Sequence, residues 1–371
     1  MTDTLRLWMR HEAHPTEARA PIAPADARIL TADGIAVTVE DSPQRIFPTS
    51  DYARAGCRIA EPGTWPDAPD DHHVIGVKEP EEKPFPLRHR HLFFGHAYKG
   101  QEGAGRLLRR FAEGGGSLLD LEYVTDADGT RVAAFGYWAG YMAATLAVLH
   151  SRGRLERPLR PLPERALAAV LAQRGEQREQ QEQRGGPREG PRGEGAPTAL
   201  VIGALGRSGR GARSALAAAG VATTCWDVEE TRDLDKKALL AHDILVNAVA
   251  TTEPAPAFLT RADLDAPGRR LSVISDVTCD FTSDRNLLPV YDRPTDWHRP
   301  VRRLREGPPP VDVIAIDNLP SLVPREASED FSADLLPHLR LLGVRTPAWQ
   351  RCLEMFHAAR PHAALTKETD V

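Results

Sequence analysis

The sequence predicts an α/β protein of two domains, each built on a parallel sheet. Over the first 150 residues, short apolar runs alternate with helical patterns, which is the rhythm of βαβ units. A second strand–helix–strand series begins abruptly at Thr198. The chain also has 371 residues, more than a single hydrophobic core usually serves. Together these observations predict two α/β domains.

Each series supplies its own elements. In the first, we expect a helix over Ala25–Asp33 that ends at Gly34, a helix with a basic face over Gly100–Gly114, and strands at Arg6–Met9, Ile35–Val39, His73–Val77 and His91–Phe94. In the second, we expect a helix over Gly209–Ala219 and strands at Ala199–Ile202, Ala222–Trp226, His242–Val249, Arg270–Asp276 and Val311–Asp317. The tail returns to helices from Leu319.

A low-complexity segment separates the two series. A helix over Pro161–Gln173 runs into residues 173–197, which are rich in Gln, Arg, Glu, Gly and Pro and have almost no apolar residue. Such a composition buries too little apolar surface to offset the entropy of ordering, so we expect a flexible surface insertion.

The composition is that of an ordinary globular protein. A net charge of -5 gives no electrostatic reason to expect nucleic acid or an anionic membrane as a partner. The N-terminus lacks a signal-peptide core, and no apolar run is long enough to span a membrane. The four cysteines are widely spaced and form no CxxC pair. We therefore expect a cytoplasmic protein without disulfides. His89, His91 and His96 lack a recognised ligand spacing, so we expect no metal.

A glycine pattern in the second series predicts a dinucleotide site. Gly203, Gly206 and Gly209 follow a predicted strand and open a helix, where glycines let the backbone approach a pyrophosphate and the helix N-terminus offers free N–H groups. Asp227 ends the next strand, where an acid binds the ribose hydroxyls. The acidic Glu229 and Glu230 beside it would repel a 2′-phosphate, so NAD is favoured over NADP. The pattern alone would also fit simple turns.

Three ionisable residues in the first series follow predicted strands. Ligands of parallel sheets bind beyond the carboxyl ends of strands, and Lys78, His96 and Glu122 each lie at such an end. Each also has a simpler explanation, as a solvated loop lysine, a surface histidine or an ion-pair partner. Their convergence favours a functional site.

These segments resemble the NAD-dependent, lysine-forming saccharopine dehydrogenases. The resemblance covers most of the chain from Arg10 to Pro337 and rests on EARAPIAP, VEDSPQRIF, IGVKEP, GHAYKGQ, LLDLEY, RVAAFGYWAG, VIGALGRSGRGA, WDVEET, SDVTCD and IAIDNLPSLVPREASEDFSADLLP. The NLPSLVPREAS stretch is the specific part, because the glycine loop alone fits many dehydrogenases.

The resemblance implies two Rossmann-like domains flanking a central cleft. Residues 1–131 with 320–371 would bind saccharopine, and residues 132–319 would bind NAD, with a crossover helix near Val132–His150. The implied reaction is oxidation of saccharopine to L-lysine and 2-oxoglutarate, or the reverse condensation. We expect a monomer, with a weak dimer as the alternative.

The resemblance also implies roles for individual residues. Lys78 would take the amine proton and His96 would activate water. The implied substrate-binding residues are Arg19, Lys78, Glu79, Lys99, Gln101, Glu122, Arg131, Phe135, Thr278, Cys279 and Asp280. The implied cofactor-binding residues are Gly203, Gly206, Arg207, Gly209, Asp227, Thr231, Ala250, Val277, Ile316, Asp317, Asn318 and Leu319. For Arg19, a structural ion pair near Glu17 is the alternative.

Departures from the family pattern leave other functions open. Asn318 stands where the family commonly has a histidine, and residues 282–310 match poorly. The alternatives are therefore an enzyme that forms another opine or imine, an alanine dehydrogenase, and a catalytically silent NAD-binding scaffold. The exact amine and 2-oxo acid, the physiological direction and the role of the insertion do not follow from the sequence.

Overall fold

The computed structural model describes residues 5–98, 103–173, 197–251, 253–344 and 346–365. Nearly all of the expected insertion at 173–197 lies outside these residues, as do Lys99 and Gln101. The chain divides into two compact units, Met1–Phe135 with Pro324–Val371, and Gly136–Val323. We call these unit 1 and unit 2. Within the described part of the chain, no helix is both long and apolar enough to cross a membrane.

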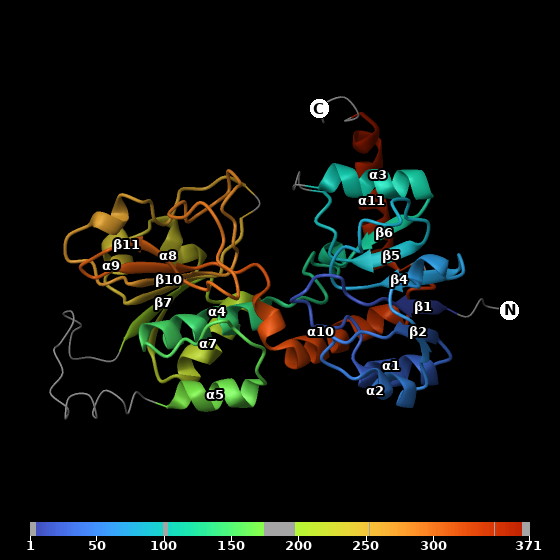
Figure 1. The fold of residues 1–371 in the computed structure, drawn as a ribbon. Coiled ribbons are helices and arrows are strands. Elements are labelled where there is room, and N and C mark those ends of the chain that lie inside the picture. Colours follow the sequence, from blue (N-terminus) through green and yellow to red (C-terminus); the bar gives the residue numbers. More distant parts are fainter. Residues whose placement is uncertain (1–4, 99–102, 174–196, 252, 345, 366–371) are drawn as a thin grey trace. The chain divides into compact units, whose positions relative to one another are not determined.

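Unit 1 contains a six-stranded, fully parallel sheet in the order β3-β2-β1-β4-β5-β6 (Figure 1). Its strands are β1 (Arg6–Met9), β2 (Ala36–Glu40), β3 (Arg58–Ala60), β4 (His72–Ile75), β5 (Arg90–Phe93) and β6 (Ser117–Asp120). The strand order reverses direction between β1 and β4, where parallel sheets leave room for ligands beyond the carboxyl ends. The backbone pairing of β4 with β5 continues to Val77.

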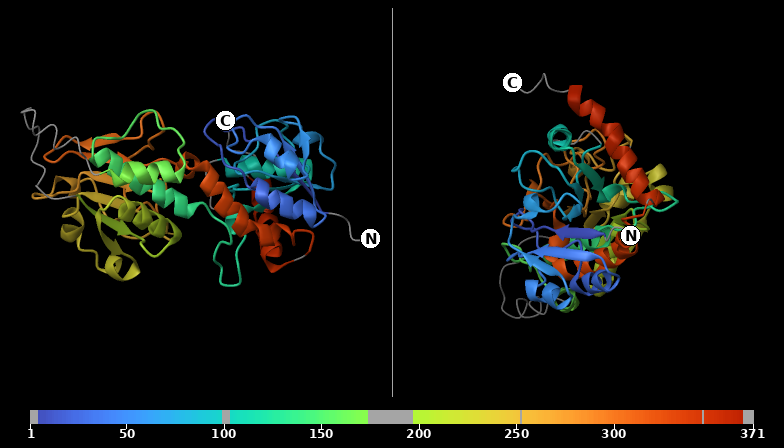
Figure 2. Two further views of the ribbon diagram at one scale, coloured as in Figure 1. Left: turned by 90° about the horizontal axis from the view of Figure 1, so that it is seen from below. Right: turned by 90° about the vertical axis from the view of Figure 1, so that its right-hand side faces the viewer.

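Helices from both ends of the chain cover this sheet. They are α1 (Pro24–Ala32), α2 (Thr49–Arg54), α3 (Ala104–Gly114), α10 (Pro324–Leu339) and α11 (Pro347–Leu365), with short 3-10 turns η1 (Trp65–Asp67) and η2 (Leu121–Tyr123). The C-terminal α11 is one continuous helix, which the right-hand view of Figure 2 shows in red, and it packs on α3 and β6. Trp65, Phe93, Phe111 and Phe356 form part of the core between them. The last segment of the chain therefore completes the first domain.

Unit 2 contains a second six-stranded sheet in the order β11-β12-β10-β9-β7-β8. Its strands are β7 (Thr198–Ile202), β8 (Ala222–Trp226), β9 (Ile244–Asn247), β10 (Val273–Asp276), β11 (Arg302–Arg305) and β12 (Val311–Ile314). Its helices are α4 (Gly136–Ser151), α5 (Glu164–Ala172), α7 (Arg207–Ala218), α8 (Val228–Arg232) and α9 (Lys236–Leu240), with 3-10 turns η3 (Asp263–Asp265) and η4 (Leu319–Leu322). The sheet is parallel except for β11, which pairs antiparallel with β12.

Helix α4 is buried in unit 2 because two glycines let α7 approach it closely. A Cβ atom at Gly140 would lie 2.5 Å from the carbonyl carbon of Ser208, and one at Gly211 would lie 2.8 Å from that of Tyr137. Both neighbours are backbone, which cannot move aside cheaply. Eleven residues of α4 are buried, so it is apolar on all sides rather than amphipathic.

The fold class expected from the sequence is confirmed, with several corrections to element boundaries. Helix α7 begins at Arg207, two residues before the expected start, and α3 begins at Ala104 after Gly103, which has a positive φ of 82°. The strands expected at His242–Val249 and Arg270–Asp276 are shorter at their ends, and β12 ends at Ile314 rather than Asp317. The residues wrongly added to these strands include the apolar Val249 after β9, Leu271 before β10, and Ala315 and Ile316 after β12, which explains the overestimate. The antiparallel strand β11 is a further difference, since a sheet that is parallel throughout was expected.

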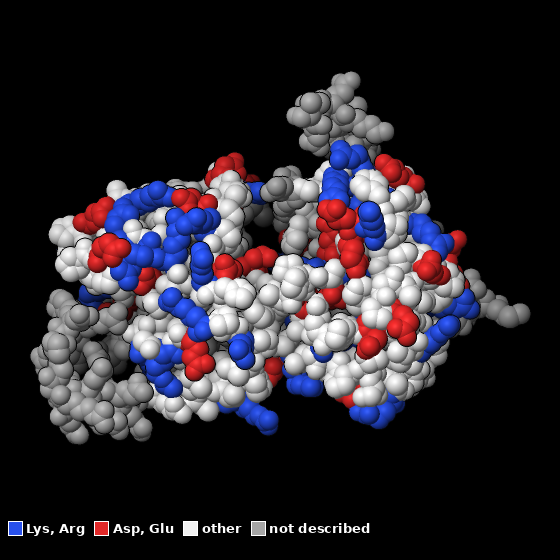
Figure 3. Space-filling model, in the orientation of Figure 1, with Lys and Arg blue, Asp and Glu red and all other residues white. Residues whose placement is uncertain are grey.

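The three arginines of β11, of which Arg303 is exposed and the others are half-buried, are paired with carboxylates. Arg302 pairs with Asp292 at 2.5 Å, Arg303 with Asp312 at 2.6 Å, and Arg305 with Asp265 at 2.7 Å. Figure 3 shows basic and acidic side chains intermixed on this face of the unit. Charged side chains on an edge strand discourage pairing with another chain.

Candidate active site

Three residues singled out in the sequence lie at the same edge of the unit 1 sheet. Lys78 follows the end of β4, His96 follows β5, and Glu122 lies in η2 directly after β6. All three strands are parallel, so their carboxyl ends share one edge. Lys78 is half-buried and His96 is exposed. The structure thus brings together the groups whose convergence the sequence suggested.

His96 and Glu122 are in direct contact. His96 Nδ1 lies 3.2 Å from Glu122 Oε2, and the side chains are 54% and 14% exposed, respectively. His96 has a positive φ of 49°, which a non-glycine residue adopts only when its surroundings hold it there. Its ring stacks on Phe94 with a centroid distance of 6.5 Å. The histidine is therefore held in one orientation from two sides.

Asp120, which the sequence reasoning did not assign to the site, positions Glu122. Its carboxylate accepts a hydrogen bond from the Glu122 N–H at 2.9 Å and so caps η2. The Asp120 side chain is fully buried. Burial raises the pKa of Asp120 to about 6. The sequence signal was its place at the end of a strand, two residues before Glu122.

Arg19 forms both an ion pair and an aromatic contact. Glu17 accepts from Arg19 Nε at 2.8 Å and from Nη2 at 2.6 Å, with both side chains buried. The Arg19 guanidinium also lies 4.1 Å from the centre of the Phe135 ring. Phe135 stacks on Phe331 of α10 with a centroid distance of 4.3 Å. The ion pair that the sequence left as an alternative is therefore present, and it fixes the plane of the guanidinium.

Glu79 and Arg131 lie in different surroundings. The Glu79 carboxylate pairs with Arg110 of α3 at 2.9 Å, and Arg110 also donates to the carbonyl groups of Phe85, Pro80, Glu81 and Pro84. Glu79 thus belongs to a network that holds the loop after β4. Arg131 is exposed and forms an isolated antiparallel bridge with Thr125.

The glycine loop of unit 2 has the geometry expected of a phosphate-binding turn. Gly203 has a φ of 79°, and a Cβ atom on Gly209 would lie 2.6 Å from Ala204 Cα. Gly206 is the N-cap of α7 and offers no side-chain oxygen to the first turn of the helix. The N–H groups of that turn are therefore the donors that an anion would meet.

Asp227 connects the end of β8 to this loop. Its carboxylate accepts from the Leu205 N–H at 2.9 Å and from the Val228 N–H at 3.0 Å, and it caps α8. Thr231 donates its hydroxyl to the Asp227 carbonyl at 2.8 Å. Arg207 is the first residue of α7 and is partly exposed. The acid expected on the ribose is therefore adjacent to the glycine loop.

A buried carboxylate that the sequence reasoning missed organises the end of β10. Asp276 accepts from Asn247 Nδ2 at 3.0 Å, from the Thr278 hydroxyl at 2.8 Å and from the Tyr291 hydroxyl at 2.7 Å. Burial raises the pKa of Asp276 and also that of Cys279, the latter to about 12. Cys279 has a positive φ of 50°. Asp280 accepts from Ser283, so the expected Thr278–Asp280 segment is a tightly bonded turn.

The remaining expected cofactor residues lie on loops that follow strands of the unit 2 sheet. Val277 donates its N–H to the Asn247 carbonyl at 2.9 Å, and Ala250 is exposed. Ile316, Asn318 and Leu319 are buried, whereas Asp317 is exposed. The buried side chains leave mainly backbone groups for a ligand, and their roles stay predictions.

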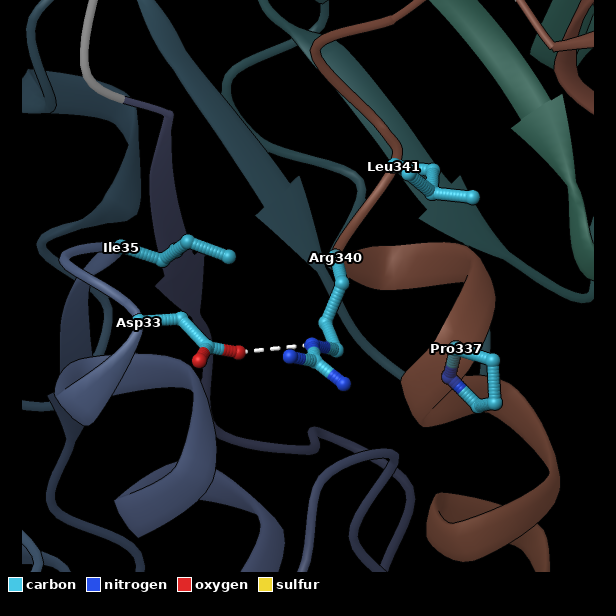
Figure 4. Close-up of a pocket in the computed structure, with 5 residues that line it drawn as sticks. All are labelled: Asp33, Ile35, Pro337, Arg340 and Leu341. Atoms are coloured by element: carbon cyan, nitrogen blue, oxygen red, sulfur yellow. Dashed lines mark ion pairs between the residues drawn. The ribbon is translucent and has the colours of Figure 1, made fainter.

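A shallow groove of about 480 Å³ lies elsewhere on unit 1 (Figure 4). Asp33, Ile35, Pro337, Arg340 and Leu341 line it, and Asp33 pairs with Arg340 at 2.6 Å. It contains none of the residues that the sequence singled out. The groove is therefore separate from the candidate site.

Comparison with known proteins places the chain in a class and then in a family. Residues 8–142 match the family described as alanine dehydrogenase/PNT, N-terminal domain. The solved structure of an L-alanine dehydrogenase covers 95% of this chain and 94% of its own, with a TM-score of 0.64 and 17% identity. These matches show that the chain shares the two-domain α/β fold of alanine dehydrogenase.

Closer relatives identify the family. The Neurospora crassa protein named saccharopine dehydrogenase [NAD(+), L-lysine-forming] is 40% identical over 97% of this chain and 99% of its own length. The Emericella nidulans protein of the same name is 40% identical over 95% and 96%, respectively. The chain belongs to the saccharopine dehydrogenase [NAD(+), L-lysine-forming] family, and the resemblance drawn from the sequence is confirmed.

Proposed function

We propose that this chain catalyses the NAD-dependent oxidation of saccharopine to L-lysine and 2-oxoglutarate, together with the reverse reductive condensation. The observation that carries the proposal is the meeting of Lys78, His96 and Glu122 at one edge of the unit 1 sheet, in a chain that belongs to this family. The reaction needs two separate proton transfers, and this edge offers two separate bases.

The residues of unit 2 fit a bound NAD. The glycine loop, the open first turn of α7 and Asp227 supply close backbone approach, N–H donors and an acceptor for ribose hydroxyls. When bound, the oxidised nicotinamide ring supplies the acceptor for a hydride. Arg207, Thr231, Ala250, Val277 and the loop 316–319 complete the proposed set of cofactor residues. Glu229 and Glu230 beside Asp227 disfavour a 2′-phosphate, so the cofactor is NAD rather than NADP.

Lys78 takes the proton of the secondary amine. Hydride cannot leave the adjacent carbon while the nitrogen is protonated, because the nitrogen lone pair must form the imine. Lys78 is half-buried at this edge of the sheet, and a lysine accepts a proton only in its neutral amine form.

His96 then activates the water that hydrolyses the imine. Since Nδ1 lies against the Glu122 carboxylate, Nδ1 carries the hydrogen and Nε2 is the basic nitrogen. Glu122 also stabilises the positive charge that the ring acquires when Nε2 takes the proton of water. Asp120 holds Glu122 in place for this task.

Arg19 binds a substrate carboxylate, with Glu17 and Phe135 keeping its guanidinium flat and fixed. Arg131, Lys99, Gln101 and Glu79 complete the proposed polar contacts in unit 1. In unit 2, the turn that contains Thr278, Cys279 and Asp280 contributes the contacts near the nicotinamide.

All four cysteines are free thiols, which is consistent with the proposed cytoplasmic location. A monomer remains our proposal for the oligomeric state.

The substrate is tested by following NADH oxidation in the reductive direction. Lysine with 2-oxoglutarate should be turned over, whereas ornithine with 2-oxoglutarate, and pyruvate with ammonia, should be poor substrates. Faster turnover of either alternative would make the chain another opine-forming enzyme or an alanine dehydrogenase. NAD binding without any turnover would indicate a silent scaffold.

The catalytic roles are tested with Lys78→Met and His96→Gln. Each should lower kcat by at least about 100-fold, as expected for the loss of a general base. Lys237→Met on α9, an exposed lysine of unit 2, is the control and should keep wild-type kcat. Near-normal turnover of saccharopine by the double variant would disprove the assignment.

A further inference from the structure

The three residues that follow β1 surround the backbone of Lys78. Glu12 accepts from the Val77 N–H at 2.5 Å and from the Lys78 N–H at 3.1 Å. Arg10 donates through Nη2 to the Lys78 carbonyl oxygen. Arg10 and Glu12 also face each other at 3.4 Å, and their side chains are only 0% and 4% exposed. Both backbone groups of Lys78 are thus held by one buried ion pair.

A glycine makes room for this ion pair. A Cβ atom on Gly76 would lie 2.5 Å from the guanidinium carbon of Arg10. The Gly76 N–H meanwhile donates to the Leu92 carbonyl at 2.9 Å, which continues the pairing of β4 with β5. The guanidinium therefore lies directly against the strand end, two residues before Lys78.

His11 ties down the loop on the other side of Lys78. Its Nδ1 lies 2.8 Å from Glu40 Oε2, and its Nε2 lies 2.7 Å from Glu81 Oε1. Glu40, the last residue of β2, is fully buried and also accepts from Trp8 Nε1 at 3.0 Å and from the Gly63 N–H at 3.0 Å. Through His11, this rigid carboxylate is connected to Glu81, three residues past Lys78.

His11 forms a bridge between the carboxylates of Glu40 and Glu81, and the charges of this bridge are stable near neutral pH. Hydrogen bonds that the His11 ring donates to Glu40 and Glu81 raise the pKa of His11 to about 9. Burial opposes ionisation of Glu81, but the His11 hydrogen bond, a backbone hydrogen bond and the charges of His11 and Arg10 together lower its pKa to about 2. Arg110 reinforces the same loop by donating to the Glu81 carbonyl. His11 and Glu81 therefore form an ion pair between about pH 2 and pH 9.

We propose that Arg10, His11 and Glu12 are positioning residues for Lys78. They hold the backbone before and after Lys78, so that the side-chain nitrogen of the lysine occupies a single position. The proposal rests on the proposed function, in which Lys78 is the base. A buried ion pair contributes little net stability compared with apolar residues of the same volume, because both charges lose their hydration. Its effect is to fix the position of the backbone at the end of β4. A displacement of a catalytic group by about 1 Å can lower the rate about 100-fold.

The test compares His11→Ala, Glu81→Gln and Glu12→Gln with wild type. The kcat for saccharopine should fall about 10- to 100-fold in each variant, while the Kd for NAD, whose proposed site is in unit 2, stays unchanged. The limb of the pH–kcat profile that belongs to Lys78 should move. The His11→Ala and Glu81→Gln effects should not add in the double variant, because both remove one bridge.

The matched control is His72→Gln. His72 also pairs with a carboxylate, Asp71, at 2.9 Å, but it lies at the opposite end of β4 from Lys78. It should leave kcat and the pH profile unchanged. If the three variants lost thermal stability yet kept wild-type kcat and pH profile, their role would be merely structural and the proposal would fail.

A second readout does not depend on turnover. The rate at which Lys78 reacts with trinitrobenzenesulfonate, followed against pH by peptide mass spectrometry, should change in His11→Ala and Glu81→Gln but not in His72→Gln. Unchanged labelling overturns the positioning role even if Glu12→Gln fails to fold. Lack of saccharopine turnover by wild type, combined with altered labelling, would instead overturn the proposed function and leave the positioning role supported.

Discussion

Adding a single methyl group at Gly209 should weaken NAD binding more than it weakens folding. A Cβ atom there would lie 2.6 Å from Ala204 Cα and closer still to the carbonyl oxygen of Gly203. Carbon atoms pack at about 3.5 Å or more, so the backbone of the loop must move by about 1 Å. Overpacking of this kind costs about 1–3 kcal/mol.

The cost should appear mainly in NAD affinity. If the displaced loop must return to its original place to accept the pyrophosphate, about 1–3 kcal/mol raises the Kd about 5- to 150-fold. Calorimetric titration of Gly209→Ala with NAD measures this directly. Gly343→Ala is the control, since among the described residues no atom beyond its chain neighbours lies within 4 Å of its added Cβ, and its φ is not positive. Wild-type affinity in Gly209→Ala would refute the assignment of this loop to the cofactor.

Two further predictions concern stability. Gly140→Ala should lower the free energy of unfolding by about 1–3 kcal/mol in urea titrations, because the new methyl group meets the backbone of Ser208. His11→Gln should destabilise the protein by about 1–2 kcal/mol below pH 6.5, after allowance for partial solvent screening. The pKa of His11 is raised to about 9 by Glu40 and Glu81, so its stabilising effect is complete below the unfolded value of 6.5 and is lost as pH rises through 9. Urea titrations from pH 6 to 10 check this, and a difference between the two proteins that stayed constant across that range would contradict it.

The elements that carry strong local patterns could be predicted from the sequence. Apolar β-branched runs located β2, β7 and β9, and the glycine spacing located the start of α7 to within two residues. Strand β3 has the sequence RIA and β11 has RRLR, so neither shows a period of two or an apolar run. These two strands form by pairing at sheet edges, and such pairing depends on the rest of the fold rather than on local sequence.

The candidate site was predictable where a chemical group stands at a strand end. That rule located Lys78, His96 and Glu122, because the ends of parallel strands must share an edge. It could not find the partner of Glu79, since Arg110 lies 31 residues away on α3. Nor could it show that the buried Asp276 accepts from Asn247 and Tyr291, because those donors lie 29 and 15 residues away along the chain. Hydrogen-bond and ion-pair partners that lie far apart in the sequence are brought together by the tertiary fold, so patterns in a single sequence do not reveal them.

The return of the chain to unit 1 explains why its site cannot form from the N-terminal segment alone. Phe135 is the last residue before the chain enters unit 2, and the ring on which it stacks, Phe331, lies on α10 after unit 2 ends. The same helix fixes the backbone around Arg19, because the Ala20 N–H donates to the Ser328 hydroxyl at 2.9 Å. The surroundings of the proposed carboxylate-binding arginine therefore depend on residues more than 300 positions later. The chain must therefore pass through all of unit 2 before the residues that complete this corner of unit 1 are present.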